Sequence, residues 1–288
     1  MTNVERYLAP RSLSEAAEGL RDGNVTILAG GTDLMPQSKS GKAKFGACLM
    51  NIRRVDELRQ ILRTAAGFRI GALTTIAELR DSPEIRNDLP ALWQASDHFA
   101  SDQIRNAATI GGNLSNASPA GDTLVPLLMF GARVVLASKP NGTLQTRSVP
   151  LAEFLLGPGK TSRKPNELLA AVEMDAPPPG FISRFFKFGT RPALDISTIS
   201  IALGAVHDGE RLRDVRVAIG AVAPTVIRAP HVEEALEGKA LDSATIAAAA
   251  TAAGRDIRPI SDVRASDWYR RELVHNMLER MLSHVGHG

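Results

Sequence analysis

Residues 25–33 read VTILAGGTD, an apolar run that leads directly into a pair of glycines. The β-branched and apolar residues of 25–28 predict a strand, and Gly30 and Gly31 allow a sharp turn at its end. A backbone without side chains can bring its N–H groups close to an anion, so this turn is a candidate phosphate-binding loop. For one glycine pair alone, an ordinary turn without a ligand is the commoner structure.

A second pair, Gly111-Gly112, lies in the stretch AATIGGNLSNASPAGD at 107–122. Both glycine stretches are rich in small polar residues, which add hydroxyl and amide donors. Two facing loops of this kind are able to hold a pyrophosphate, and two turns without a ligand remain an equal alternative. Asp122 is a candidate acceptor for ribose hydroxyls, although its spacing alone favours a cap for the apolar run 124–129.

Three familiar motifs of nucleotide-binding proteins and hydrolases do not fit. No GxGxxG opens a helix after a strand, so a Rossmann site is not indicated. The run GPGKT at 157–161 resembles a P-loop, but Phe154 stands where the first glycine is required, and Pro158 has no N–H to offer a phosphate. There is also no GxSxG nucleophile motif, and we assign no catalytic residue.

Composition excludes several classes of protein. The 288 residues carry 34 Lys+Arg and 31 Asp+Glu, and the net charge of +3 does not favour nucleic-acid binding. Cys48 is the single cysteine, so an internal disulfide and a four-thiolate cluster are impossible, and any iron–sulfur centre belongs to another chain. The histidines lack zinc-binding spacing, so no metal site is expected. No apolar run approaches the ~20 residues that span a bilayer, and no signal peptide is evident, which predicts a cytoplasmic protein.

Local signals predict short helices and strands in alternation. A capping box at Ser12–Glu15 starts a helix expected to end at Gly23, and Asn141-Gly142 between two apolar runs predicts a hairpin. Three consecutive prolines in DAPPPG, residues 175–180, mark the best domain boundary.

Beyond the prolines, residues 181–188, 198–206 and 215–222 are expected to form a three-stranded antiparallel sheet. Asp242 and Ser266 would cap the helices that follow. The predicted fold class is therefore α+β.

Lys187 lies in FFKFGTRPALDIS, residues 185–197. Strand alternation puts it on the face opposite Phe186 and Phe188, which favours a solvated lysine. The functional alternative is a positive charge that stabilises a reduced, anionic cofactor ring. Arg191 and Asp195 are more typical of loop and cap residues than of ligands, and Phe99 is more typical of a core residue than of a ring-stacking platform.

Five motifs occur together in order: ILAGGTDLM (27–35), QIRNAATIGGNLSNASPAGD (103–122), FLLGPGKT (154–161), FFKFGTRPALDISTIS (185–200) and VAPTVIRAP (222–230). They resemble the FAD-binding medium subunit of the molybdenum hydroxylases, the xanthine dehydrogenase and carbon monoxide dehydrogenase flavoprotein family. The bacterial xanthine-dehydrogenase-type FAD subunit is the most similar branch.

The resemblance implies a two-part FAD-binding domain of the vanillyl-alcohol-oxidase type, residues 1–176 with parts of about 1–55 and 56–176. A flavoprotein C-terminal domain, residues 177–288, would follow. Two loops would enclose the FAD pyrophosphate, Asp122 would bind the adenosine ribose, and Lys187 would lie beside the flavin. The implied cofactor-binding residues are Ile27, Leu28, Ala29, Gly30, Gly31, Thr32, Asp33, Thr109, Ile110, Gly111, Gly112, Asn113, Asp122, Leu168, Leu169 and Lys187.

The resemblance also implies an oxidoreductase subunit that transfers electrons. A small partner subunit would hold [2Fe–2S] clusters and a large one the molybdenum cofactor, as a dimer of heterotrimers, with NAD or another molecule as acceptor. Two other functions stay open: a standalone FAD-dependent oxidase, and a non-catalytic assembly subunit whose glycine pairs are only turns. Phe99 matches a place where some relatives stack an aromatic ring on the flavin.

Overall fold

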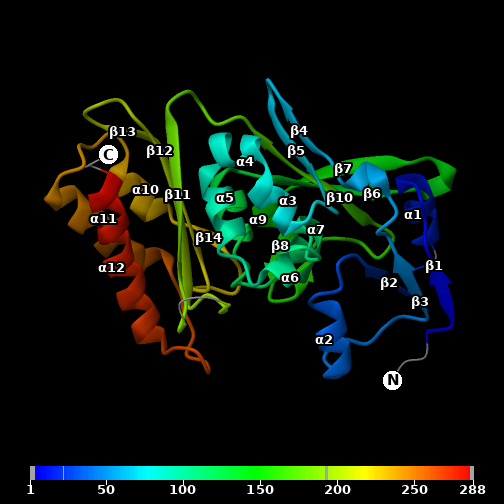
Figure 1. Ribbon diagram of the computed structural model, residues 1–288. Coiled ribbons are helices and arrows are strands. Elements are labelled where there is room, and N and C mark those ends of the chain that lie inside the picture. Colours follow the sequence, from blue (N-terminus) through cyan, green and yellow to red (C-terminus); the bar gives the residue numbers. More distant parts are fainter. Residues whose placement is uncertain (1–3, 22, 192–193, 286–288) are drawn as a thin grey trace. The chain divides into compact units, whose positions relative to one another are not determined.

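The computed structural model describes residues 4–21, 23–191 and 194–285 (Figure 1). The chain divides into two compact units. Neither unit is continuous in sequence. The first unit comprises Met1–Leu79, Ser101–Ala117 and Gly131–Asp175, and the second comprises Arg80–Ala100, Ser118–Phe130 and Ala176–Gly288. Helix α3 (Ile76–Asp81) carries the chain from the first unit into the second.

The first unit contains two larger sheets. Strands β1 (Arg6–Leu8), β3 (Cys48–Asn51) and β2 (Val25–Leu28) form a parallel sheet in that order. An antiparallel sheet follows the order β4-β5-β10-β6-β7. Its strands are β4 (Ile61–Thr64), β5 (Gly67–Gly71), β10 (Leu168–Asp175), β6 (Arg133–Ser138) and β7 (Gln145–Pro150).

Helix α1 (Leu13–Gly19) joins the two sheets of this unit into one core, because its buried face packs against residues of both. Ala16 lies with Met50 and Leu168 in a single apolar cluster. Burial of such side chains supplies most of the stabilisation of a core. The remaining elements of the unit are α2 (Leu34–Lys39), η1 (Asp56–Leu58), α6 (Asp102–Arg105), α7 (Ile110–Asn116), η2 (Pro140–Gly142), α9 (Leu151–Phe154), and a two-stranded ribbon of β8 (Leu155–Gly157) and β9 (Lys160–Thr161).

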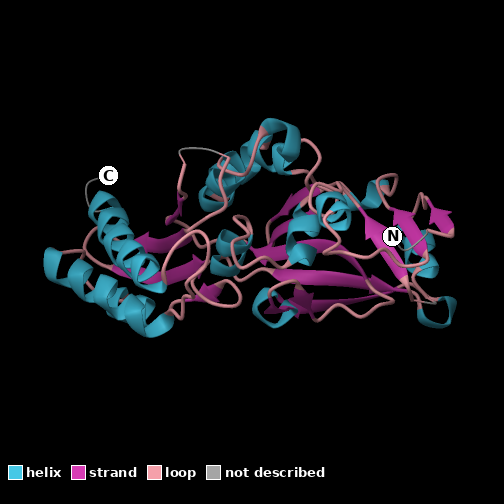
Figure 2. Ribbon diagram, turned by 90° about the horizontal axis from the view of Figure 1, so that it is seen from below, coloured by secondary structure: helices cyan, strands magenta, loops and turns pink. Residues whose placement is uncertain are grey.

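The second unit is built on an antiparallel sheet of order β11-β12-β13-β14. Alternate residues of β12, among them Ile199 and Ile201, pack against the C-terminal helices, which lie alongside the strands in Figure 2. The strands are β11 (Phe181–Phe188), β12 (Ile199–His207), β13 (Leu212–Gly220) and β14 (Ile227–Arg228), and these helices are α10 (Pro230–Leu236), α11 (Ser243–Asp256) and α12 (Asp267–Val285).

The opposite face of this sheet is covered as well. Helix α8 (Leu124–Met129) packs on β12 and β13, and α5 (Pro90–Asp97) packs on β11; α4 (Pro83–Asp88) precedes α5. Gly220 permits the close approach of α8, because a Cβ there would lie 2.7 Å from Cγ2 of Val125. The strands of this unit are therefore covered on both faces.

Local predictions agree closely with these elements. Ser12 accepts from the N–H of Glu15 at 3.1 Å, Asp242 caps α11 and Ser266 caps α12, as expected. The hairpin at Asn141-Gly142 is confirmed as β6 and β7. Two details of the prediction were wrong: α1 ends at Gly19 instead of Gly23, and the C-terminal sheet gains a fourth, two-residue strand, β14.

Candidate functional site

The first glycine loop leaves the end of β2 and lies against backbone from another part of the first unit. A Cβ on Gly30 would stand 1.8 Å from the carbonyl oxygen of Ala107, so no other residue fits there without moving the backbone. Gly31 has φ +74°, a left-handed conformation that glycine adopts without strain. The close contact brings residues 29–33 next to the segment that opens α7, so the two predicted glycine stretches lie together.

The backbone N–H groups of this loop find no acceptor in the part of the chain that the structure describes. Among the described residues, the N–H groups of 29–33 donate to no protein acceptor. Two carbonyls of the loop are engaged, since Gly31 and Asp33 accept from the N–H groups of Met35 and Gln37 of α2 at 3.1 and 3.0 Å. These successive backbone N–H groups, the donor array of residues 29–33, are available to an anion.

The second glycine pair has a different structure from the predicted turn. Gly111 and Gly112 lie inside helix α7, and Thr109 is its N-cap, with Oγ1 accepting from the N–H of Gly112 at 3.0 Å. The N–H groups of Ile110 and Gly111 donate to carbonyls of the strand end at 72–74. The prediction of a glycine turn is wrong here, because Thr109 caps a helix that contains both glycines.

Gly111 has a packing reason of its own. A Cβ at this position would lie 2.7 Å from both Cβ and the carbonyl oxygen of Ala72, so glycine lets α7 rest on the end of β5. At Gly112 a Cβ would meet only Oγ1 of Thr109, at 3.0 Å. Helices α7 and α2 are also linked by the Gln37 amide, which donates to Oδ1 of Asn116 at 3.3 Å.

Leu168 and Leu169 begin β10 and are buried, with 2% and 3% of their surfaces exposed. Leu168 belongs to the core cluster of the first unit. The ladder to β6 shifts by one residue after Leu169, which is a β-bulge. The side chains of Leu168 and Leu169 therefore pack inside the protein, and the irregularity of this segment is the backbone bulge after Leu169.

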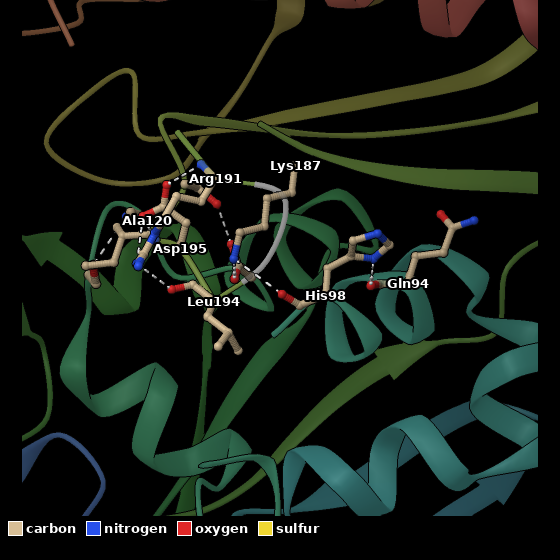
Figure 3. A network of polar contacts seen from close by, with 11 residues as sticks. Gln94, His98, Ala120, Lys187, Arg191, Leu194 and Asp195 are labelled. Atoms are coloured by element: carbon tan, nitrogen blue, oxygen red, sulfur yellow. Dashed lines mark hydrogen bonds and ion pairs between the residues drawn. The ribbon is translucent and has the colours of Figure 1, made fainter. Parts of the chain in front are cut away.

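The second unit holds a buried ion pair that the sequence patterns did not predict. Nζ of Lys187 donates to Oδ2 of Asp122 at 2.6 Å, and Oγ of Ser197 donates to Oδ1 at 2.6 Å. The side chains of Lys187 and Asp122 are only 9% and 8% exposed. Nζ also approaches the carbonyl oxygen of His98 at 3.4 Å (Figure 3).

Two expectations are corrected by this arrangement. Lys187 does not lie on a solvated face, because α5 and α8 cover the side of the sheet opposite the C-terminal helices. Asp122 is not the cap of the apolar helix either, since Thr123 is the N-cap residue of α8. Burial raises the pKa of the Asp122 carboxyl, against the lowering effects of Lys187, Ser197 and His98.

Arg191 and Asp195 are loop residues, as predicted. The Asp195 carboxylate accepts from Oγ1 of Thr190 at 2.6 Å and from the N–H groups of Thr190, Arg191 and Ile196, and Figure 3 shows it beside Arg191. These hydrogen bonds, first that from the Thr190 side chain, lower the pKa of Asp195 to about 2. Phe99 is half-buried, so it is not a core residue.

Other candidates take ordinary structural roles. The GPGKT run forms the β8–β9 ribbon, with Gly159 at φ +70° in its turn, and Cys48 is buried and free.

In the part of the chain that the structure describes, no group of three His, Cys, Asp or Glu side chains is arranged to bind a metal. No helix within the described ranges is long and apolar enough to cross a membrane.

Comparisons with known proteins cover nearly the whole chain. Residues 2–176 match the family model of the FAD binding domain in molybdopterin dehydrogenase, and residues 184–285 match that of the CO dehydrogenase flavoprotein C-terminal domain. The chain is similar to the putative xanthine dehydrogenase FAD-binding subunit XdhB of Escherichia coli (strain K12), with 34% identity over 98% of this chain and 96% of that one.

Two further similarities concern carbon monoxide dehydrogenase of Hydrogenophaga pseudoflava. Its medium chain is 32% identical over 96% of this chain and 95% of its own length. The solved structure of that enzyme, in a form lacking the Mo-pyranopterin moiety, superimposes with a TM-score of 0.90 at 32% identity, over 97% of this chain and 96% of that one.

Proposed function

The chain belongs to the FAD-binding subunits of the molybdenum hydroxylases, and from this premise we propose that it passes electrons from iron–sulfur clusters on a partner subunit to NAD or another acceptor. Its cofactor is FAD, and it is a subunit of an oxidoreductase. When bound, FAD supplies the ability to accept electrons singly and release them as a pair.

The proposed assembly is a dimer of heterotrimers in the cytoplasm. A small subunit would carry [2Fe–2S] clusters and a large subunit the molybdenum cofactor. Support comes from relatives that are named as the medium chain of an enzyme or as one subunit of a dehydrogenase complex. Native mass spectrometry of the purified complex tests the stoichiometry, and a chain that runs alone would contradict it.

We further assign the FAD-binding domain to residues 1–176, with the vanillyl-alcohol-oxidase type of fold, and the C-terminal domain to 177–288. The end of β10 at Asp175, directly before the three prolines, supports this boundary. Limited proteolysis should cut in this linker first.

The donor array of residues 29–33 is the observation that carries the proposal. An FAD pyrophosphate needs several N–H donors at close range, and this loop offers them with no competing protein acceptor among the described residues. Thr109 to Asn113 would contribute side-chain groups and the exposed surface at Gly112, since the N–H groups of 110–113 are used within the protein.

Lys187 and Asp122 would serve the other parts of the cofactor. A buried ammonium favours the more negative, reduced form of a nearby flavin. Among the described contacts each Asp122 oxygen accepts one hydrogen bond, and a carboxylate oxygen has room for a second, which leaves capacity for a cofactor hydroxyl near Lys187.

Thr32→Glu tests the loop directly. Its half-buried side chain has no hydrogen bond among the described contacts, so the substitution adds one negative charge beside the donor array. At about 5 Å from a phosphate charge and an effective dielectric of about 20, the repulsion is about 3 kcal/mol, or more than about 100-fold in Kd. FAD absorbance and fluorescence titration measure that constant.

Thr146→Glu is the matched control, because Thr146 is an exposed residue of β7 in the same unit. It should bind FAD as the unmodified chain does. A purified chain that is colourless and takes up no FAD would overturn the proposal, and equal weakening by both substitutions would overturn the loop assignment.

A further inference from the structure

Ser197 is the third member of the buried cluster around Asp122, and the proposed function gives it no role. Its hydroxyl is buried, with 1% of the residue exposed, and it donates to the Asp122 oxygen that Lys187 does not contact. The two donors thus take opposite oxygens of one carboxylate. Asp122 is held by a neutral donor on one side and a cation on the other.

Among the residues that the structure describes, few charged groups act on this carboxylate. Lys187 of β11 and His98, after α5, are the charged or titratable groups that act on it. Helix α8, which follows Asp122, contains only apolar side chains, LVPLLM. Loss of the Ser197 hydroxyl would therefore remove one of the few interactions that keep Asp122 ionised.

We propose that Ser197 is a positioning residue that keeps Asp122 ionised and paired with Lys187, and so sets how much positive charge Lys187 presents to the flavin. This inference rests on the proposed function for the identity of the cofactor. An ionised Asp122 compensates Lys187, whereas a protonated Asp122 leaves its charge uncompensated. An uncompensated ammonium favours the reduced flavin and raises its midpoint potential.

Ser197→Ala should produce a difference in potential that depends on pH. Removing a donor to a carboxylate raises the pKa of Asp122, so the variant holds a proton over a range of pH where the unmodified protein does not. Within that range the variant's flavin potential should be higher, by at least about tenfold in the equilibrium constant, or about 30 mV for two electrons. Above and below it the two potentials should coincide. His98 is present in both proteins, so its effect on Asp122 cancels in the difference.

Three controls make the experiment specific. Ser183→Ala removes another buried serine of the same unit, one that accepts from the N–H of Ala91 at 3.3 Å, and it should leave the potential unchanged. Ser197→Thr keeps a hydroxyl and should restore the original pH profile. In a Lys187→Met background, Ser197→Ala should have no further effect, because no ammonium remains to be compensated.

Redox titration of the FAD-loaded chain across pH measures these differences. A shift of equal size at every pH, or no shift with FAD fully bound, would overturn the inference. Failure of the proposed function is a separate outcome, seen as absence of FAD from the unmodified chain. The cofactor-free protein then still tests the effect on Asp122: relative to the unmodified chain, the free energy of unfolding of Ser197→Ala should fall as pH rises, and a constant difference would refute it.

Discussion

Lys187→Met should destabilise the second unit to an extent that grows with pH. The substitution removes the cation from a pair whose side chains are 9% and 8% exposed, and leaves Ser197 as the hydrogen-bond donor to Asp122. A buried carboxylate that has lost its cation is costly, and it avoids that cost by taking a proton. The unfolded chain does not hold this proton above its ordinary pKa of about 3.9.

The size of the effect follows from the cost of keeping that proton. Keeping Asp122 protonated costs about 1.36 kcal/mol for each pH unit above the unfolded-state pKa of about 3.9. The loss of stability is then about 4 kcal/mol at pH 7 and about 1.5 kcal/mol at pH 5. In the variant the pKa of Asp122 is higher in the folded state than in the unfolded state. The free energy of unfolding is therefore highest below the unfolded-state pKa and falls as pH rises. The Lys187–Asp122 pair itself contributes close to zero net free energy to folding, because the desolvation of the two charges offsets their attraction.

Tryptophan emission during urea unfolding provides the assay. Both tryptophans, Trp93 and Trp268, lie in the second unit, so their signal reports on that unit. Asp122→Asn combined with Lys187→Met should recover most of the stability lost at pH 7. An equal loss at pH 5 and pH 7, or no loss at pH 7, would refute the reasoning.

Two further predictions concern the loops. Gly30→Ala should destabilise the first unit by about 3 kcal/mol, because its Cβ would stand 1.8 Å from the Ala107 carbonyl oxygen. Circular dichroism melting checks this, and an unchanged melting curve would contradict it. Asp195 should titrate at about 2 by carboxyl carbon NMR, so the bonds it accepts persist at neutral pH and are lost as pH falls towards that value; a midpoint near 3.9 would show that they do not form in solution.

Caps and tight turns were predictable because their chemistry is complete within four or five residues. Ser12, Asp242 and Ser266 each bond to an N–H three residues ahead, and the pattern alone identifies such pairs. The helix at Gly111-Gly112 was missed although a signal existed: Thr109 precedes the pair as an N-cap residue should. Because glycine has a low helix propensity, the two adjacent glycines favoured a turn more strongly than Thr109 favoured a helix.

The ion pair was beyond the reach of these patterns. Strand alternation correctly put Lys187 and Phe186 on opposite faces, but it could not tell which faces are covered by helices. Ser197 carried no signal at all, because its partner Asp122 lies 75 positions away in the chain. Pairings over such separations depend on how the sheet and its helices pack.

The amino-acid sequence by itself determined the family, the cofactor class, the single thiol and most caps and strands, because each of these depends on residue identity or short-range hydrogen bonding. Tertiary structure alone decided that, among the described residues, the N–H groups of 29–33 have no protein acceptor while those of Ile110 and Gly111 do, and that Lys187 and Ser197 both donate to Asp122. The physical reason is desolvation: whether a polar group is exposed, satisfied or left available is set by which surfaces pack around it.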